Sequence, residues 1–216
     1  MSGFPQSPRL LKGGLVLMDV TTSTVQRIIA LQYNPDSVSR SFQIQGVGVD
    51  TGDRSELLRL KGPPVETWKV DVEMDATDQL EIADSTASQV GLQAQLAAIE
   101  VIAYPTSTQL QNLDSQAQSG TLEVAAVEAP LTIFVWSKQR IMPVRLTEFS
   151  ITEEAFDPNL NPIRAKVSLG MRVLNVNDTG FGSRAGGLFM TYLQNKEQLA
   201  RRSSNAVFST LGIAGF

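Results

Sequence analysis

The residues best suited to acid–base chemistry are Glu153, Glu154 and Asp157, which lie within five positions of one another. Two carboxyl groups facing one pocket can act as acid and base, or as acid and nucleophile, in glycoside hydrolysis. Neighbouring residues of a strand point to opposite faces, so Glu153 and Glu154 cannot both enter one pocket. If the following turn is centred near Leu160, Glu153 lies opposite Lys166 and forms a cross-strand ion pair. The sequence therefore favours a structural role for these carboxylates.

Two other patterns resemble ligand sites only in composition. Asp71, Glu73, Asp75, Asp78 and Glu81 do not have the spacing of a calcium-binding loop, which needs a glycine at the sharp turn and a closing glutamate. The glycine-rich stretch 180–187 lacks the Lys-Ser/Thr pair of a phosphate-binding loop. We predict no metal site, no cofactor and no catalytic residue.

The composition excludes several classes of function. The 216 residues contain no cysteine and no histidine, which removes thiolate chemistry, the common zinc ligands and the usual general base. The formal net charge is −4, without the excess of basic residues that nucleic-acid binding requires. No window approaches the roughly 20 apolar residues of a membrane-spanning helix. We therefore expect a soluble, non-enzymatic protein that is made in the cytoplasm and binds neither nucleic acid nor membrane.

Residues 141–176 predict an unusually long β-hairpin around the turn FDPNLNP. After the turn, alternate residues form an apolar stripe and a cationic stripe; the cationic one contains Arg164, Lys166 and Arg172. Before the turn, the apolar residues change parity near Thr147–Glu148, which predicts a β-bulge. Arms of more than ten residues exceed the usual strand length, so we expect the hairpin to contact another subunit.

The remaining elements are a mixture of strands and helices. Alternation predicts strands at 14–20, 25–34 and 67–74, and the apolar run 130–136 predicts a strand buried on both faces. Residues 78–103 favour one helix or two shorter ones, residues 106–120 a mobile insertion or a short helix, and residues 188–202 a C-terminal helix. The expected fold class is mostly β within an α+β layout, a closed or nearly closed antiparallel barrel or a sandwich. The predicted organisation is an N-terminal arm (1–13), a β domain (14–176) with a helical insertion (78–120), and a Gly-rich linker with a C-terminal helix or tail (177–216).

Two segments resemble the signatures of one family. LQYNPDSVSRSF (31–42) resembles the segment that opens the tube-type domain of contractile injection system proteins. MPVRLTEFSITEEAFDPNLNPIRAKVSLGMRV (142–173) resembles the second signature of that family. The resemblance spans most of residues 15–176 and implies a tube-protein-like antiparallel β-barrel. Many baseplate members carry a C-terminal LysM module, but no such pattern follows residue 177, so glycan binding is not implied here.

The resemblance implies a structural protein of a phage-tail-like particle. It would form a hexameric ring in the baseplate, adapting the central spike to the inner tube, and would assemble in the bacterial cytoplasm. Its partners would be its own copies, the spike protein, the inner-tube protein and other baseplate proteins. The residues assigned to subunit contact or structure are Tyr33, Asn34, Pro35, Trp136, Glu153, Glu154, Phe156, Asp157, Pro162, Arg164, Lys166 and Arg172.

Two alternatives remain open. The chain could be the inner-tube protomer or a tube initiator, although a repeating tube subunit usually lacks so large an insertion as 78–120. It could instead be a glycan-acting module of the cell wall that uses Glu153 or Glu154 together with Asp157.

Overall fold

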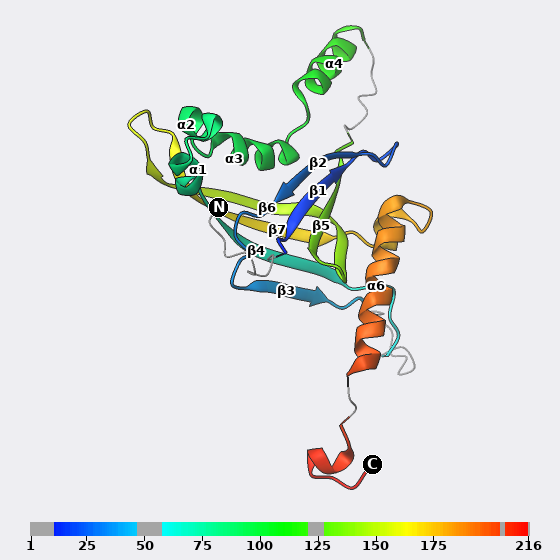
Figure 1. The fold of residues 1–216 in the computed structure, drawn as a ribbon. Helices are drawn as coiled ribbons and strands as arrows, with labels where there is room; N and C mark the ends of the chain where they lie inside the picture. The colour runs from blue at the N-terminus through cyan, green and yellow to red at the C-terminus, as the bar shows by residue number, and fades with distance from the viewer. Residues whose placement is uncertain (1–10, 47–57, 121–127, 204–205, 216) are drawn as a thin grey trace.

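The computed structural model describes residues 11–46, 58–120, 128–203 and 206–215. Within them, seven strands form one sheet in the order β2-β1-β5-β6-β7-β4-β3, and all the pairings between neighbours are antiparallel (Figure 1). The strands are β1 Gly14–Met18, β2 Val25–Ala30, β3 Val38–Gln43, β4 Val65–Asp75, β5 Leu131–Ser137, β6 Arg140–Phe156 and β7 Pro162–Val173. The helices are α1 Thr77–Glu81, α2 Ser85–Val90, α3 Gln93–Glu100, η2 Val101–Ala103, α4 Ser107–Gln118, α5 Val176–Thr179, α6 Arg184–Arg202 and η3 Phe208–Leu211. The predicted α+β, mostly-β fold class is confirmed.

Strand β6 divides the sheet into two parts. Its first residues pair with β5 as far as Val144, and the stretch from Val144 to Phe156 pairs with β7. The register shifts between Leu146 and Glu148, so the predicted β-bulge is confirmed. A bulge bends and twists the strand. The two parts of the sheet share one core, in which the ring of Trp68 meets the ring of Phe134 edge-on at 5.6 Å between centroids.

Backbone pairing leaves the sheet open. The strand order begins at β2 and ends at β3, and within the described residues these two strands are not paired with each other. The closure of a barrel within one chain, which the sequence suggested, is therefore not made in this part of the protein. The sheet instead has end strands whose outer N–H and C=O groups can accept another strand.

The alternation of β4 and β7 builds the core. Trp68, Val70, Val72 and Met74 are buried, as predicted, while the residues between them face away from the core. The apolar stripe of β7 is buried in the same way from Ala165 to Val173. Fully burying such a side chain stabilises the fold by about 1.5–3 kcal/mol. The sequence predicted that the strand at 130–136 is buried on both faces. In β5 this holds for the first four of its seven residues.

The segment predicted as one or two helices forms three short helices and a 3₁₀ turn. Asp84 begins α2 by accepting hydrogen bonds from the backbone N–H groups of Thr86 and Ala87, at 3.0 and 2.9 Å. Gly91 ends α2 with a φ of +56°. Residues 107–118 form the helix α4, which starts with a capping box between Thr106 and Gln109 and contains no buried residue. In Figure 1, α4 extends away from the sheet.

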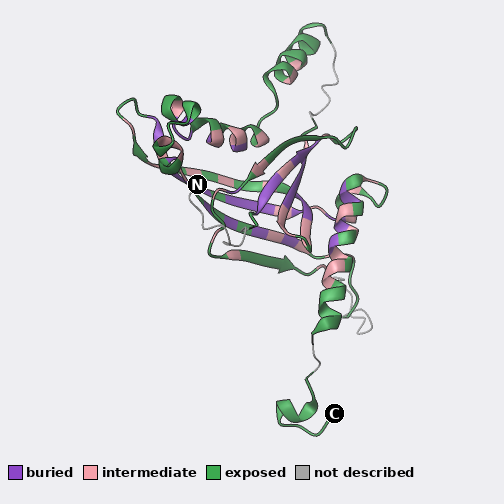
Figure 2. Cartoon of the chain, in the orientation of Figure 1, coloured by how far each residue is buried: buried purple, intermediate pink, exposed green. Residues whose placement is uncertain are grey.

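The C-terminal helix is longer than predicted. It starts at Arg184, where the Ser183 hydroxyl accepts a hydrogen bond from the backbone N–H of Gly186 at 2.9 Å. Its first half is buried on one side through Ala185, Phe189 and Tyr192, and its last turns are exposed (Figure 2). The helix thus packs onto the sheet and then continues beyond it (Figure 1).

Candidate subunit interface

The turn of the long hairpin is built around Asp157. Its carboxylate accepts hydrogen bonds from the backbone N–H groups of Asn159 and Asn161, at 2.7 and 2.8 Å, and from the Asn161 side-chain amide at 2.8 Å. The Asn161 side chain, then its backbone N–H, hold the pKa of Asp157 below its ordinary value. Phe156 and Pro162 are the last paired residues, so five residues form the loop. Both oxygens of Asp157 are therefore used by the turn itself.

The register corrects one prediction. Glu153 lies opposite Ala165, and Lys166 lies opposite Thr152. The predicted Glu153–Lys166 pair is wrong because the loop is centred on Asn159, one position before the Leu160 that the prediction assumed. Lys166 instead binds Glu154, with 3.1 Å between Nζ and the carboxylate.

The cations of the predicted basic stripe, together with Lys69 of β4, are paired within the chain. They lie on the side of β6, β7 and β4 opposite to the core, which we call the ion-pair face. The pairs are Lys69–Glu148 at 2.9 Å, Arg164–Asp75 at 3.0 Å, Lys166–Glu154 at 3.1 Å and Arg172–Asp178 at 2.6 Å. The two pairs with both side chains exposed, Lys69–Glu148 and Lys166–Glu154, contribute about 0–1 kcal/mol each. The face therefore carries balanced charges, and its contact with a neighbouring subunit remains a prediction.

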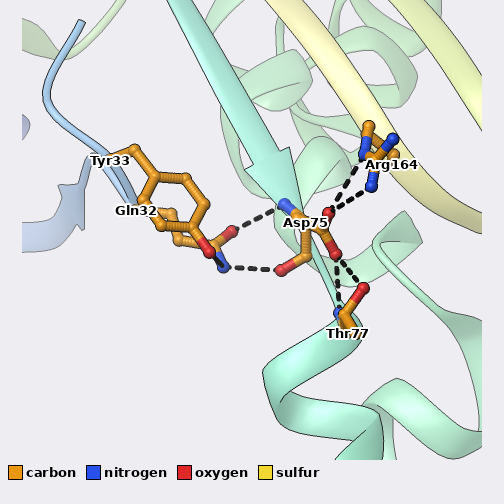
Figure 3. Close-up of polar contacts among 5 residues, drawn as sticks. All are labelled: Gln32, Tyr33, Asp75, Thr77 and Arg164. Atoms are coloured by element: carbon orange, nitrogen blue, oxygen red, sulfur yellow. Dashed lines mark hydrogen bonds and ion pairs between the residues drawn. The ribbon is translucent and has the colours of Figure 1, made fainter.

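Asp75 joins the two signature segments (Figure 3). The side chain of Gln32 brackets the Asp75 backbone: its oxygen accepts from the N–H at 2.9 Å, and its amide donates to the C=O at 2.5 Å. The Asp75 carboxylate accepts from the backbone N–H of Thr77 at 2.8 Å, from the Thr77 hydroxyl, and from Arg164 at 3.0 Å. Gln32 belongs to the first segment and Arg164 to the second, so the end of β4 connects them.

Asn34 fastens the start of the described chain. Its side-chain oxygen accepts a hydrogen bond from the N–H of Gly13 at 3.0 Å, and its amide donates to the C=O of Leu11 at 2.7 Å. Tyr33, Asn34 and Pro35 line one surface groove together with Lys166. The structure thus brings part of the first segment beside the hairpin.

The other predicted residues are spread over the fold. Pro162 is buried and its C=O accepts a hydrogen bond from the N–H of Leu92 at 2.9 Å, which ties the hairpin to the start of α3. Trp136 is half-buried beside Phe134, at 6.1 Å between ring centroids. Phe156 is 49% exposed at the hairpin tip. These residues do not form one site.

Sequence reasoning missed a buried polar cluster under α6. Glu66 is 4% exposed, and its carboxylate accepts hydrogen bonds from the Trp68 indole at 2.9 Å, the Tyr192 hydroxyl at 2.7 Å and the Lys196 ammonium at 2.7 Å. Burial, followed by the adjacent Glu66, raises the pKa of Tyr192 far above its ordinary value. The cluster anchors α6 to β4. Its signal was present in the sequence, since Glu66 has the same parity as the buried residues of its strand.

Acidification is expected to destabilise the fold through Asp75 and Asp157. Both pKa values lie below the ordinary 3.8, that of Asp75 chiefly because of its hydrogen bonds from Thr77 and then from Arg164. A lowered folded-state pKa contributes stability above the unfolded pKa, and this contribution is lost as the pH falls through the folded value. We expect the melting temperature to decrease as the pH is lowered below about 4. In Asp75→Asn this decrease should be less steep. Equal pH slopes for the two proteins would contradict this role of Asp75.

In the described residues, no cluster of three or more acidic side chains could hold a metal ion, and no helix has the length and hydropathy to cross a membrane.

No family profile matches the chain, and no curated protein matches it. Among solved structures, the chain is similar to a chain of the "tail of empty GTA particle computed with helical refinement, C6 symmetry", with 15% identity and a TM-score of 0.28. It is also similar to a chain of the "virion of native gene transfer agent (GTA) particle", with 13% identity and a TM-score of 0.26. Each alignment covers 74% of this chain and 90% of the other. Similarity this weak does not establish a shared function.

Proposed function

We propose that the protein is a non-catalytic, ring-forming component of a phage-tail-like particle, which adapts the spike of a contractile injection system to its inner tube. The observation that supports the ring is the four-stranded unit β6-β7-β4-β3, in which the outer edges of β3 and of β6 beyond Leu146 have no strand partner among the described residues. The assignment to a baseplate rests on the resemblance of segments 31–42 and 142–173 to the family signatures.

The first free edge belongs to β6. From Leu146 to Phe156, its strand partner in the described part of the chain is β7 alone. The second belongs to β3, whose partner there is β4. Unpaired edges of this kind are templates for pairing with another chain.

The strand directions suit a closed ring. The four strands alternate in direction, because each neighbouring pair is antiparallel. As the first and fourth of these alternating strands, β6 and β3 run in opposite directions. A rotation about an axis roughly along the strands keeps these directions, so the β3 of one copy lies antiparallel to the β6 of the next copy. Repeating that head-to-tail contact gives a closed ring if the rotation closes. The six copies come from the family resemblance.

The same geometry disfavours the glycan-acting alternative. Both carboxylate oxygens of Asp157 accept hydrogen bonds from Asn159 and Asn161 within the turn. Glu153 and Glu154 lie on opposite faces of β6, so they cannot act together in one pocket. The inner-tube protomer remains the alternative within the same class, since it would use the same strand edges.

The proposal predicts disulfide bonds between copies at the β3–β6 joint. Because the natural chain has no cysteine, a single introduced cysteine reports one contact. Ser39 and Ser41 of β3, and Ser150 and Thr152 of β6, lie on the ion-pair face. Mixing each β3 single-cysteine protein with each β6 one, under mild oxidation, is expected to give a cross-linked dimer in at least one combination and a larger ring by sedimentation.

A matched control is Ser115→Cys on α4, an exposed serine far from both strands in the fold. It should not cross-link to either edge. If all four edge combinations gave no dimer, and the chain stayed monomeric with and without spike and tube proteins, the proposal would be wrong.

A further inference from the structure

The hairpin tip presents two apolar side chains to solvent. Leu160 is 77% exposed and has a φ of +65°, and Phe156 is 49% exposed. We call this pair the tip knob. The left-handed conformation of Leu160 is unfavourable for a branched side chain and suits glycine or asparagine. The chain thus keeps a large apolar side chain at a position where its own fold would favour a smaller residue.

The tip end of the hairpin is hydrogen-bonded to the helical segment. The N–H of Leu92 donates to the C=O of Pro162 at 2.9 Å, and the side-chain amide of Asn161 donates to the C=O of Gln89 at 3.1 Å. Both bonds connect the hairpin to α2 and α3, which lie beside the tip in Figure 1. A tip that is held in place before binding loses little conformational entropy when it docks.

A surface groove of matching character lies between β2 and α3. Its apolar lining includes Ile28, Ala98 and Ile99, and its charged residues are Lys12 and Arg27. Ile28 is 69% exposed. The groove is apolar with basic residues, whereas the tip knob is apolar and flanked by the acidic residues Glu153 and Asp157. The two surfaces are complementary in hydrophobicity and in charge.

We infer that the tip knob docks into the β2–α3 groove of a second copy of this chain. The inference rests on the proposed ring. Strand β3 pairs with β4 only as far as the Val38–Val70 pair, whereas β4 continues to Asp75 and the hairpin extends further still. A neighbour's β6 paired with β3 therefore carries its tip past Val38, towards residues 31–37 that lead back to β2.

Single-cysteine proteins test this contact directly. Leu160→Cys mixed with Ile28→Cys is expected to yield a disulfide-linked dimer under mild oxidation. Leu160→Cys mixed with Leu110→Cys is the control, because Leu110 is an exposed leucine of α4, outside the groove. Cross-links at the β3–β6 edges without a Leu160–Ile28 cross-link would overturn this inference and leave the proposed ring intact. Absence of both would overturn both.

A glycine substitution separates docking from folding. Leu160→Gly relieves the left-handed strain and removes the knob, so the melting temperature of the protomer should not fall while self-association weakens at least tenfold. Reversing one charge, as Arg27→Glu or Glu153→Lys, should also weaken association, and combining the two reversals should restore it. Unchanged association of Leu160→Gly, or no recovery in the combined variant, would contradict the docking.

Discussion

Replacing Glu66 by alanine is expected to lower the free energy of unfolding by about 3–5 kcal/mol, the cost of breaking a buried ion pair by removing one partner. The carboxylate is the shared acceptor for Trp68, Tyr192 and Lys196. Its loss leaves the indole N–H and the phenol O–H without that acceptor in a buried place, and such donors are costly when unsatisfied. Because Lys196 is partly exposed, we expect the loss for Glu66→Ala to lie near the lower end of this range of about 3–5 kcal/mol. Urea unfolding followed by circular dichroism measures the change.

Glu148→Ala is the matched control for Glu66→Ala. Its carboxylate also pairs with a lysine, Lys69, at 2.9 Å, but both side chains are more than half exposed. An exposed pair contributes about 1 kcal/mol at most, so the control should unfold almost like the natural protein. Glu66→Gln, which keeps one acceptor oxygen, should fall between the two. If Glu66→Ala were no more damaging than Glu148→Ala, the cluster would not be what anchors α6.

The sheet could be predicted where apolar and polar residues alternate strictly. Trp68 to Met74 and Ala165 to Val173 follow a period of two, and these strands carry the core. The bulge was also visible, because the change of parity near Thr147 has only one simple explanation in a paired strand. Periodicity failed at the tip, where the register depends on which residues close the loop. The hydrogen bonds of Asp157 decide that, and they leave no trace in the apolar pattern.

The helical segments were harder because their limits depend on single polar residues. Asp84 begins α2, and Ala83 before it has a φ of +53°. The chain therefore turns at a point where the pattern of apolar residues predicts a continuous helix. In α6, the cap at Ser183 adds a turn before Leu188, including Gly186, whose backbone packs against the C=O of Gly180. A helix limit set by one side chain cannot be read from average propensity.

The sequence selected two candidate segments but not the geometry that joins them. The resemblance selected segments 31–42 and 142–173, and the structure joins them through Gln32, Asp75 and Arg164. Gln32 and Asp75 were not assigned to the interface, because their bonds cross more than 40 positions of the sequence. Nor could the sequence show that the basic stripe is neutralised by carboxylates from β4 and β6, since that pairing follows from the strand order.

Replacing Gly91 by alanine is expected to cost about 2–6 kcal/mol, as the sum of two separate effects. Its φ of +56° and ψ of −130° lie in a region that side chains other than hydrogen avoid, at about 1–3 kcal/mol. A Cβ there would also lie 2.4 Å from the C=O oxygen of Pro162, so the backbone must shift, at a further 1–3 kcal/mol or so. Gly91 is therefore the position that allows the start of α3 to approach the tip end of the hairpin.

Gly120→Ala separates the two effects of the Gly91 substitution. Gly120 has a φ of +81°, and a Cβ there would meet no heavy atom of the described residues within 4 Å. It should therefore lose only about 1 kcal/mol, the cost of the left-handed backbone alone. Equal losses at both positions, measured by urea unfolding, would show that close contact between Gly91 and Pro162 is unimportant. The difference that we expect instead would mean that the helical insertion positions the hairpin tip, because the contact that tolerates only glycine is the one joining the two.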